Sequence, residues 1–173
     1  MRAKMIIMLV IPLLAVLFFV QLEIRRSLNS VAETERTFQL LQFTVIFSDM
    51  VHELQKERGL SSAYLGSINT ARREKFSAKL ITQHRLSDTK IAAAESFLTH
   101  FDVLEFGTRF PQKLNQAIAD LAQIDQKRRI ILHREMDYTE ALGYYTDTLN
   151  GQFLSFIAEL VTLSSINQQG EFN

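Results

Sequence analysis

An uninterrupted helical pattern near the start of the chain constrains its fold more than any other feature. No proline or glycine occurs from Ser30 until Gly59, and the apolar residues of this stretch recur three or four positions apart, as on one face of a helix. They are Leu40, Phe43, Phe47, Val51 and Leu54, with Leu65 beyond the glycine. The 173 residues include only two prolines and six glycines, and the alternation of apolar and polar residues that marks strands is missing. The sequence therefore predicts an all-α fold.

An uncharged apolar run precedes this pattern. Residues 5–20 read MIIMLVIPLLAVLFFV, and the run extends to Leu22 and Ile24, which approaches the length of about 20 apolar residues that a spanning helix needs. A cleavable signal peptide carries small residues after its apolar core, whereas residues 18–23 read FFVQLE. We therefore predict that residues 1–28 form an uncleaved transmembrane helix.

Turn and capping signals divide residues 29–173 into four helical runs. Residues 67–70 (SINT) form a turn with capping side chains, and Pro111 suits the first turn of a third helix that Thr108 caps. Asp137 followed by Glu140 has the logic of a capping box. Short connections make successive helices antiparallel, so we predict an up-down four-helix bundle after the anchor. The 13 phenylalanines are expected to pack its core, with no cofactor.

Arg58 is the residue that this fold leaves to be explained. Helical spacing places Arg58 and Ser61 on the apolar face with Leu54, while Glu57 lies to one side. A buried guanidinium is costly without a partner. The partner is either a carboxylate, from Asp88, Glu95 or Asp147, or a small planar anion, which matches the donor fork of a guanidinium. Ser61 and Ser62 can add hydroxyl donors, and Gly59 leaves room for a close approach.

Three blocks of the sequence resemble the signature of the NIT family, the nitrate- and nitrite-sensing domains of bacterial receptors. The first block runs from His52 to Ser67 (HELQKERGLSSAYLGS), the second is Gln83–Asp88 (QHRLSD), and the third is Tyr144–Thr146 (YYT). The resemblance implies that Arg58 binds the anion. We expect Ser61 and Ser62 to be further ligand-binding residues, with support from Gln55, Gly59 and Tyr145.

The resemblance also implies a biological setting. We expect the extracytoplasmic sensing module of a chemoreceptor-like signal-transduction receptor, with one span in the bacterial inner membrane and the helical domain in the periplasm. It is expected to form a homodimer and to pass a helix shift to the membrane when nitrate, nitrite or a similar anion binds. Because family members continue with further helices and an output domain, we expect residues 29–173 to be incomplete at the C-terminus and the output domain to be absent. The alternative is a membrane-anchored dimerisation stalk or adaptor without a small-molecule ligand.

Other chemistries find little support in the sequence. His52-Glu53 begins like the zinc motif HExxH, but Lys56 stands where the second histidine must be. Lys+Arg and Asp+Glu balance at 19 each, so no overall positive field attracts nucleic acid. The basic run Lys127-Arg128-Arg129 is interpreted as the solvated last turn of a helix. We expect no enzymatic activity, metal site or nucleic-acid partner.

Overall fold

The computed structural model describes residues 2–106 and 109–169, with side chains for 16–25, 27, 34–104, 110–160 and 162. These ranges contain helices and no strand, which confirms the all-α prediction. The elements are α1 (Arg2–Leu65), α2 (Thr70–Leu98), the 3₁₀-helix η1 (Val103–Phe106), α3 (Arg109–Leu121), α4 (Ile124–Leu132), α5 (Tyr138–Gly143), the π-helix η2 (Tyr144–Asn150) and α6 (Gly151–Gln169).

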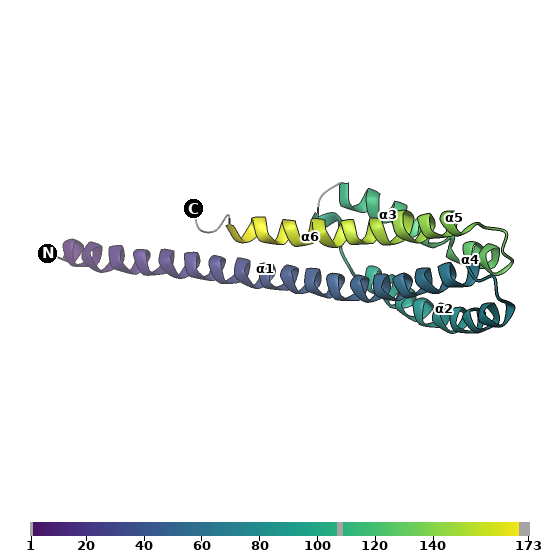
Figure 1. Ribbon diagram of the computed structural model, residues 1–173. Helices are drawn as coiled ribbons and strands as arrows, with labels where there is room; N and C mark the ends of the chain where they lie inside the picture. The colour runs from purple at the N-terminus through teal and green to yellow at the C-terminus, as the bar shows by residue number, and fades with distance from the viewer. Residues whose placement is uncertain (1, 107–108, 170–173) are drawn as a thin grey trace. The chain divides into compact units, whose positions relative to one another are not determined.

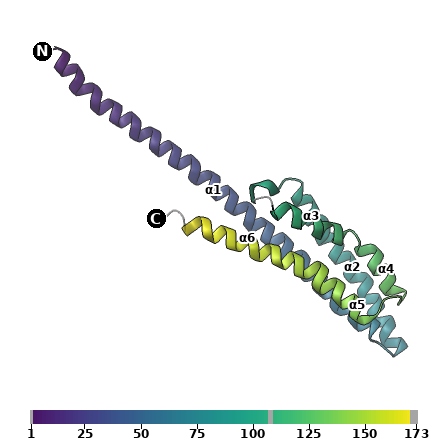
Figure 2. The same ribbon diagram turned by 90° about the horizontal axis from the view of Figure 1, so that it is seen from above.

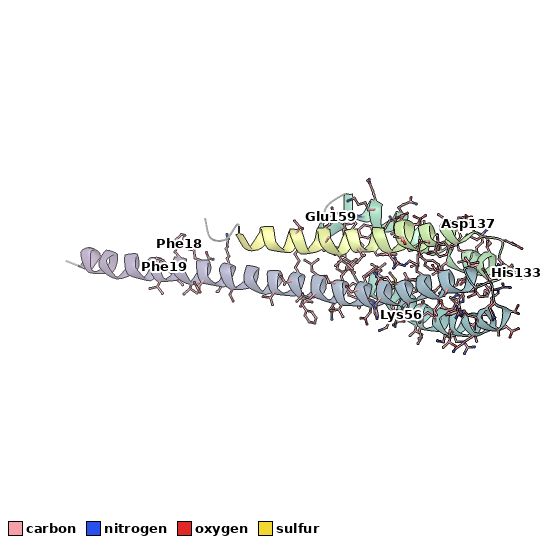
Figure 3. The ribbon with its side chains drawn as sticks, in the orientation of Figure 1. Phe18, Phe19, Lys56, His133, Asp137 and Glu159 are labelled. Carbon is pink, nitrogen blue, oxygen red and sulfur yellow. The ribbon has the colours of Figure 1, made fainter. Side chains whose placement is uncertain are left out.

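The chain divides into two compact units, residues 1–39 and 40–173. The first unit is the N-terminal part of α1, where the exposed rings of Phe18 and Phe19 meet edge to face with centroids 6.3 Å apart (Figure 3). In the described part of the chain, no helix is long and apolar enough to cross a membrane. The predicted transmembrane helix is therefore not confirmed. The side chains of residues 1–15 lie outside the described residues.

The second unit is a helical bundle whose legs run alternately in opposite directions (Figures 1 and 2). The legs are the end of α1, then α2, then α3 with α4, and finally α5 with η2 and α6. The third leg was predicted as one helix but is broken between Leu121 and Ile124. The fourth starts where it was predicted, after Asp137, and contains a π-helix that the sequence pattern did not reveal.

Local capping signals explain where several helices begin. The Asn69 side chain accepts a hydrogen bond from the Arg72 amide at 3.0 Å and so caps α2. Asp137 caps α5 by accepting from the Thr139 amide, as predicted. Pro111 stands in the first turn of α3, and its predicted cap, Thr108, lies outside the described residues.

Aromatic side chains form one part of the bundle core. Phe43 is fully buried and stacks on Phe47 with ring centroids 4.0 Å apart. Phe97, Phe101 and Phe110 surround the same ring at centroid distances of 5.2 to 6.2 Å. Phenylalanine therefore packs the core as predicted, and it joins α1 to the ends of α2 and α3.

The turn between α4 and α5 contains a backbone strain that can be relieved. Arg134 has a φ of 59°, and its amide donates to Ile131 while that of Glu135 donates to Ile130, the pattern of a Schellman motif in which glycine is the usual residue. We expect Arg134→Gly to raise the free energy of unfolding by about 1 kcal/mol, because glycine adopts this conformation without strain.

Urea denaturation measures this gain. Arg134→Ala serves as the control, because it removes the same exposed side chain but keeps the strained conformation, and its stability should stay within about 0.5 kcal/mol of the parent. A destabilised Arg134→Gly variant would contradict this account of the turn.

Candidate functional site

The buried face of α1 carries Glu57 and not Arg58. The residues that point into the bundle follow alternating steps of four and three positions, namely Phe43, Phe47, Met50, Leu54, Glu57, Ser61 and Tyr64. The prediction that Arg58 points to the core is therefore wrong. The prediction continued the apolar face from Leu54 by four positions, which leads to Arg58. In the structure the inward positions have a mean spacing of 3.5 residues, as in packed helix bundles, and the next one after Leu54 is Glu57.

Glu57 is completely buried and is held by side chains from two other elements. Arg128 of α4 donates to both of its oxygens, from Nε to Oε1 and from Nη2 to Oε2, each at 2.8 Å. The Tyr145 hydroxyl of η2 donates to Oε1 at 2.6 Å. Such a bidentate, charge-assisted pair is the strongest form of an Arg–carboxylate contact. This polar group therefore ties α1, α4 and η2 together.

Arg128 was missed because its basic neighbours suggested a solvated turn. Its side chain is only 6% exposed, so that interpretation is wrong. Arg128 lies four residues after Ile124 and three before Ile131, both of which are buried, so it belongs to the inner face of α4. That spacing was the available signal.

Two exposed carboxylates complete the partners of Arg128. Its Nη1 donates to Asp88 at 2.5 Å and to Asp125 at 3.1 Å, and those carboxylates are 56% and 76% exposed. Asp88 is thus a partner of Arg128 and not of Arg58. With Glu57, three carboxylates surround one guanidinium, so this location has an excess of negative charge.

The electrostatics keep the ion pair charged. Burial alone would raise the pKa of Glu57, but the hydrogen bonds and charge of Arg128 outweigh it, and the pKa lies below its usual value. Burial opposes the charge on Arg128 as well, yet Glu57 and Asp88 raise its pKa. Burial and the neighbouring Glu57 raise the pKa of Tyr145. Tyr145 therefore remains a protonated donor.

Some buried polar atoms next to this ion pair make no hydrogen bond of good geometry. Ser61 Oγ and Ser87 Oγ are two of them, although Ser61 lies close enough to Tyr145, and Ser87 to Glu57, to lower the pKa values of those groups. His84 Nε2 is a third. His84 Nε2 stands 3.6 Å from Glu57 Oε1. Burial nevertheless lowers the pKa of His84, because it outweighs the attraction of Glu57.

Arg58 occupies the side of α1 that faces η2. Its half-buried guanidinium donates through Nη1 to Thr146 Oγ1 at 3.3 Å. Across the described residues it has no second hydrogen-bond partner and no carboxylate at ion-pair distance. The alternative in which Asp88, Glu95 or Asp147 pairs with Arg58 is therefore wrong. Most donors of its fork remain available.

The other predicted site residues separate into three places. Gln55 and Ser62 are half-buried and, three and four positions from Arg58, share its face of the helix. Ser61 and Tyr145 belong to the buried layer of Glu57. Gly59 is exposed and borders a shallow groove between α1 and α2. Lys56, which is labelled in Figure 3, lines the same groove.

The backbone beside Gly59 is open, because a Cβ there would meet no described atom within 4 Å. Its supporting role at the site stays a prediction.

The three sequence blocks meet at one level of the bundle. Glu57 of the first block bonds Tyr145 of the third, and Arg58 bonds Thr146. Gln83 of the second block donates to the Glu53 backbone and carboxylate at 3.2 and 2.7 Å. Residues up to 93 positions apart in the chain thus form a single polar layer. Within the described residues no group of His, Asp and Glu side chains has the arrangement of a metal site.

The class of protein that these elements define is an all-helical bundle with one polar layer in its core. The sequence model of the NIT family, described as nitrate and nitrite sensing, matches residues 49–170. This match covers more than half of the chain and includes all three blocks, so the chain belongs to the NIT family. No curated protein and no solved structure matches the chain.

The buried ion pair predicts a strong stability effect. Arg128→Met leaves the Glu57 carboxylate buried without a cation, and we expect the free energy of unfolding to fall by about 3–5 kcal/mol. Glu57→Gln added to Arg128→Met removes that charge and keeps an acceptor for Tyr145, so it should recover part of the loss. Urea denaturation measures both, and Arg129→Met is the control at the exposed neighbour. A double variant no more stable than Arg128→Met would refute the charge argument.

Burial of His84 predicts a pH dependence. Its pKa in the folded protein lies below the ordinary histidine value of 6.5, so the unfolded chain binds this proton first as the pH falls. Because the unfolded state then holds more protons, the contribution of neutral His84 to stability is complete above the pKa of the unfolded chain. It declines as the pH falls below that value. We expect the free energy of unfolding to fall between about pH 7 and pH 5, with a slope of at most about 1.4 kcal/mol per pH unit from this group.

The variant His84→Gln should flatten this decline, and His133→Gln, at an exposed histidine, should not. Glu57 acts in the same direction at lower pH, since its pKa in the folded protein also lies below the ordinary value of 4.5. Equal slopes for the parent and His84→Gln would exclude His84 as the source.

Proposed function

We propose that this NIT domain binds nitrate or nitrite through Arg58, where α1 and η2 are in contact. Family membership supports the class of ligand, a small planar oxyanion. The observation that carries the choice of residue is the half-buried Arg58 guanidinium, which has one long hydrogen bond and no carboxylate partner in the described part of the chain. A guanidinium with free donors in a partly desolvated position favours a bidentate contact with an oxyanion.

Electrostatics argue against the other central arginine as the anion site. Three carboxylates already neutralise Arg128, and an anion would have to displace one of them in a region with negative charge in excess. Displacing Glu57 would leave a buried carboxylate unpaired, which is strongly unfavourable. Arg58 carries no such penalty, since an anion displaces only the weak bond to Thr146.

The residues around Arg58 supply the remaining contacts. Ser62 and Gln55 lie on its face of α1, and Thr146 stands opposite with its hydroxyl 3.3 Å from Nη1. Tyr145 acts indirectly, because its hydrogen bond to Glu57 fixes the backbone next to Thr146. Ser61 lies on the buried side with Glu57, so we assign it to the support of the polar layer and not to the ligand.

The proposed mechanism is a shift between two arrangements of α1 and η2. An anion that takes over the donors of Arg58 replaces the contact with Thr146 and so changes how these two elements are held together. A ligand shifts such an equilibrium only by its difference in affinity for the two states. The shift is passed along α1, which continues without a break from Leu65 back to Arg2.

We place this mechanism in a membrane receptor of a bacterium. Residues 1–28 would be the anchor in the inner membrane and residues 29–173 the periplasmic sensor, with the output domain outside this sequence. A homodimer fits the exposed apolar side chains of Leu41 and Val45, which are 59% and 60% exposed and four residues apart on α1.

The anion hypothesis predicts a ligand-dependent thermal stability that depends on Arg58. Nitrate or nitrite at about 100 times its dissociation constant should stabilise the full chain, purified in mild detergent, by about 2.7 kcal/mol. Chloride at the same ionic strength should not. Arg58→Ala should lose the response while changing the unliganded stability by about 1 kcal/mol or less, since only one hydrogen bond is removed.

Two further variants make the test specific. Arg58→Lys keeps the charge but loses the planar fork, so we expect it to recover only part of the response. Arg85→Ala removes an exposed arginine of α2 and should respond like the parent. A stabilisation by nitrate or nitrite that persists in Arg58→Ala would contradict the assignment of Arg58 as the anion-binding residue.

A further inference from the structure

Asn150 has a buried side chain amide with no partner for either of its polar atoms. The residue is 2% exposed, and both Nδ2 and Oδ1 lack a hydrogen bond. Leaving a buried donor and acceptor without hydrogen bonds destabilises the folded protein. An apolar residue such as leucine would avoid this cost, so a carboxamide at this place points to a bond made in another state of the protein.

The position of Asn150 in η2 places it beside Thr146. The two residues are four apart, close to one turn of a π-helix, so they lie on the same side of η2. That side faces α1, because Thr146 accepts a hydrogen bond from Arg58. The opposite side faces α3, where Tyr144 and Gln152 both donate to Asp120. Asn150 is therefore on the side of the fourth leg that looks towards Arg58.

A π-turn encloses this position. The Gly151 amide donates to the Thr146 carbonyl, an i to i+5 bond whose ring contains Asn150. A Cβ at Gly151 would stand 3.0 Å from that carbonyl oxygen, so the missing side chain allows the turn to close. Single π turns of this kind occur frequently at functional sites.

We propose that Asn150 binds the anion held by Arg58 and that it favours nitrate over nitrite. This inference rests on the proposed function. Two oxygens of a planar oxyanion match the donor fork of the guanidinium. Nitrate has a third oxygen, which can accept from Asn150 Nδ2, while nitrite has none. A site built to donate to an oxygen rejects the analogue that lacks it, because the buried donor stays unpaired.

The test compares the affinities of the full chain for nitrate and for nitrite by isothermal titration calorimetry. Asn150→Leu should weaken nitrate binding about tenfold or more, the effect of one hydrogen bond to a charged group, and nitrite binding by about threefold or less. Thermal unfolding without anion should show Asn150→Leu to be at least as stable as the parent, because two unpaired polar atoms are removed. Asn115→Leu, at an exposed asparagine of α3, is the matched control and should bind both anions normally.

The outcomes separate the two proposals. If the parent binds neither anion, the proposed function fails, and this inference fails with it. If the parent binds nitrate through Arg58 but Asn150→Leu leaves the ratio of the two affinities unchanged, only the role of Asn150 is refuted. Asn150→Ala repeats the measurement without any risk of overpacking. A loss of stability in both Asn150 variants with an unchanged affinity ratio would mean that the amide is structural.

Discussion

The arrangement of this bundle depends on one buried ion pair, between Glu57 of α1 and Arg128 of α4. Moving a carboxylate and a guanidinium out of water is costly, and the cost is offset only when the geometry is good and the remaining lone pairs are satisfied. Both conditions are met here, since both Glu57 oxygens accept from Arg128 and Tyr145 adds a third bond. A shift of one helix turn in any of the three elements would leave a charge unpaired. The main effect of the pair is therefore to select one register of the helices, and its net contribution to stability is secondary.

The same pair explains why two arginines at one level can have different roles. Arg128 is saturated by carboxylates, whereas in the described part of the chain Arg58 has one hydrogen bond, to a hydroxyl at 3.3 Å. Glu57 keeps Arg128 occupied and also fixes Tyr145, the neighbour of Thr146 in η2. The buried layer thus holds the partner of Arg58 in place while leaving the guanidinium of Arg58 itself with unused donors.

The sequence predicted the helices well and the site only in part. Caps such as Asn69 and Asp137 act over a few residues, so local patterns located them correctly. The inward face of α1 was misjudged because a charged residue, Glu57, occupies it, and an apolar stripe alone continues equally well to Arg58. Arg128 required knowledge of its partner, which lies 71 positions away. The π-helix left no signal in the apolar pattern, since one extra residue shifts the phase without breaking it.

That extra residue in η2 has a consequence for how this chain is compared with others. If the same residues formed an ordinary α-helix instead, the residues after η2 would turn by about 100° relative to those before it. Phe153, Phe156 and Leu160, which are buried now, would then leave the core together. An alignment without a gap to a relative that lacks the extra residue therefore pairs residues that point in different directions. Motifs before and after η2 need to be aligned separately.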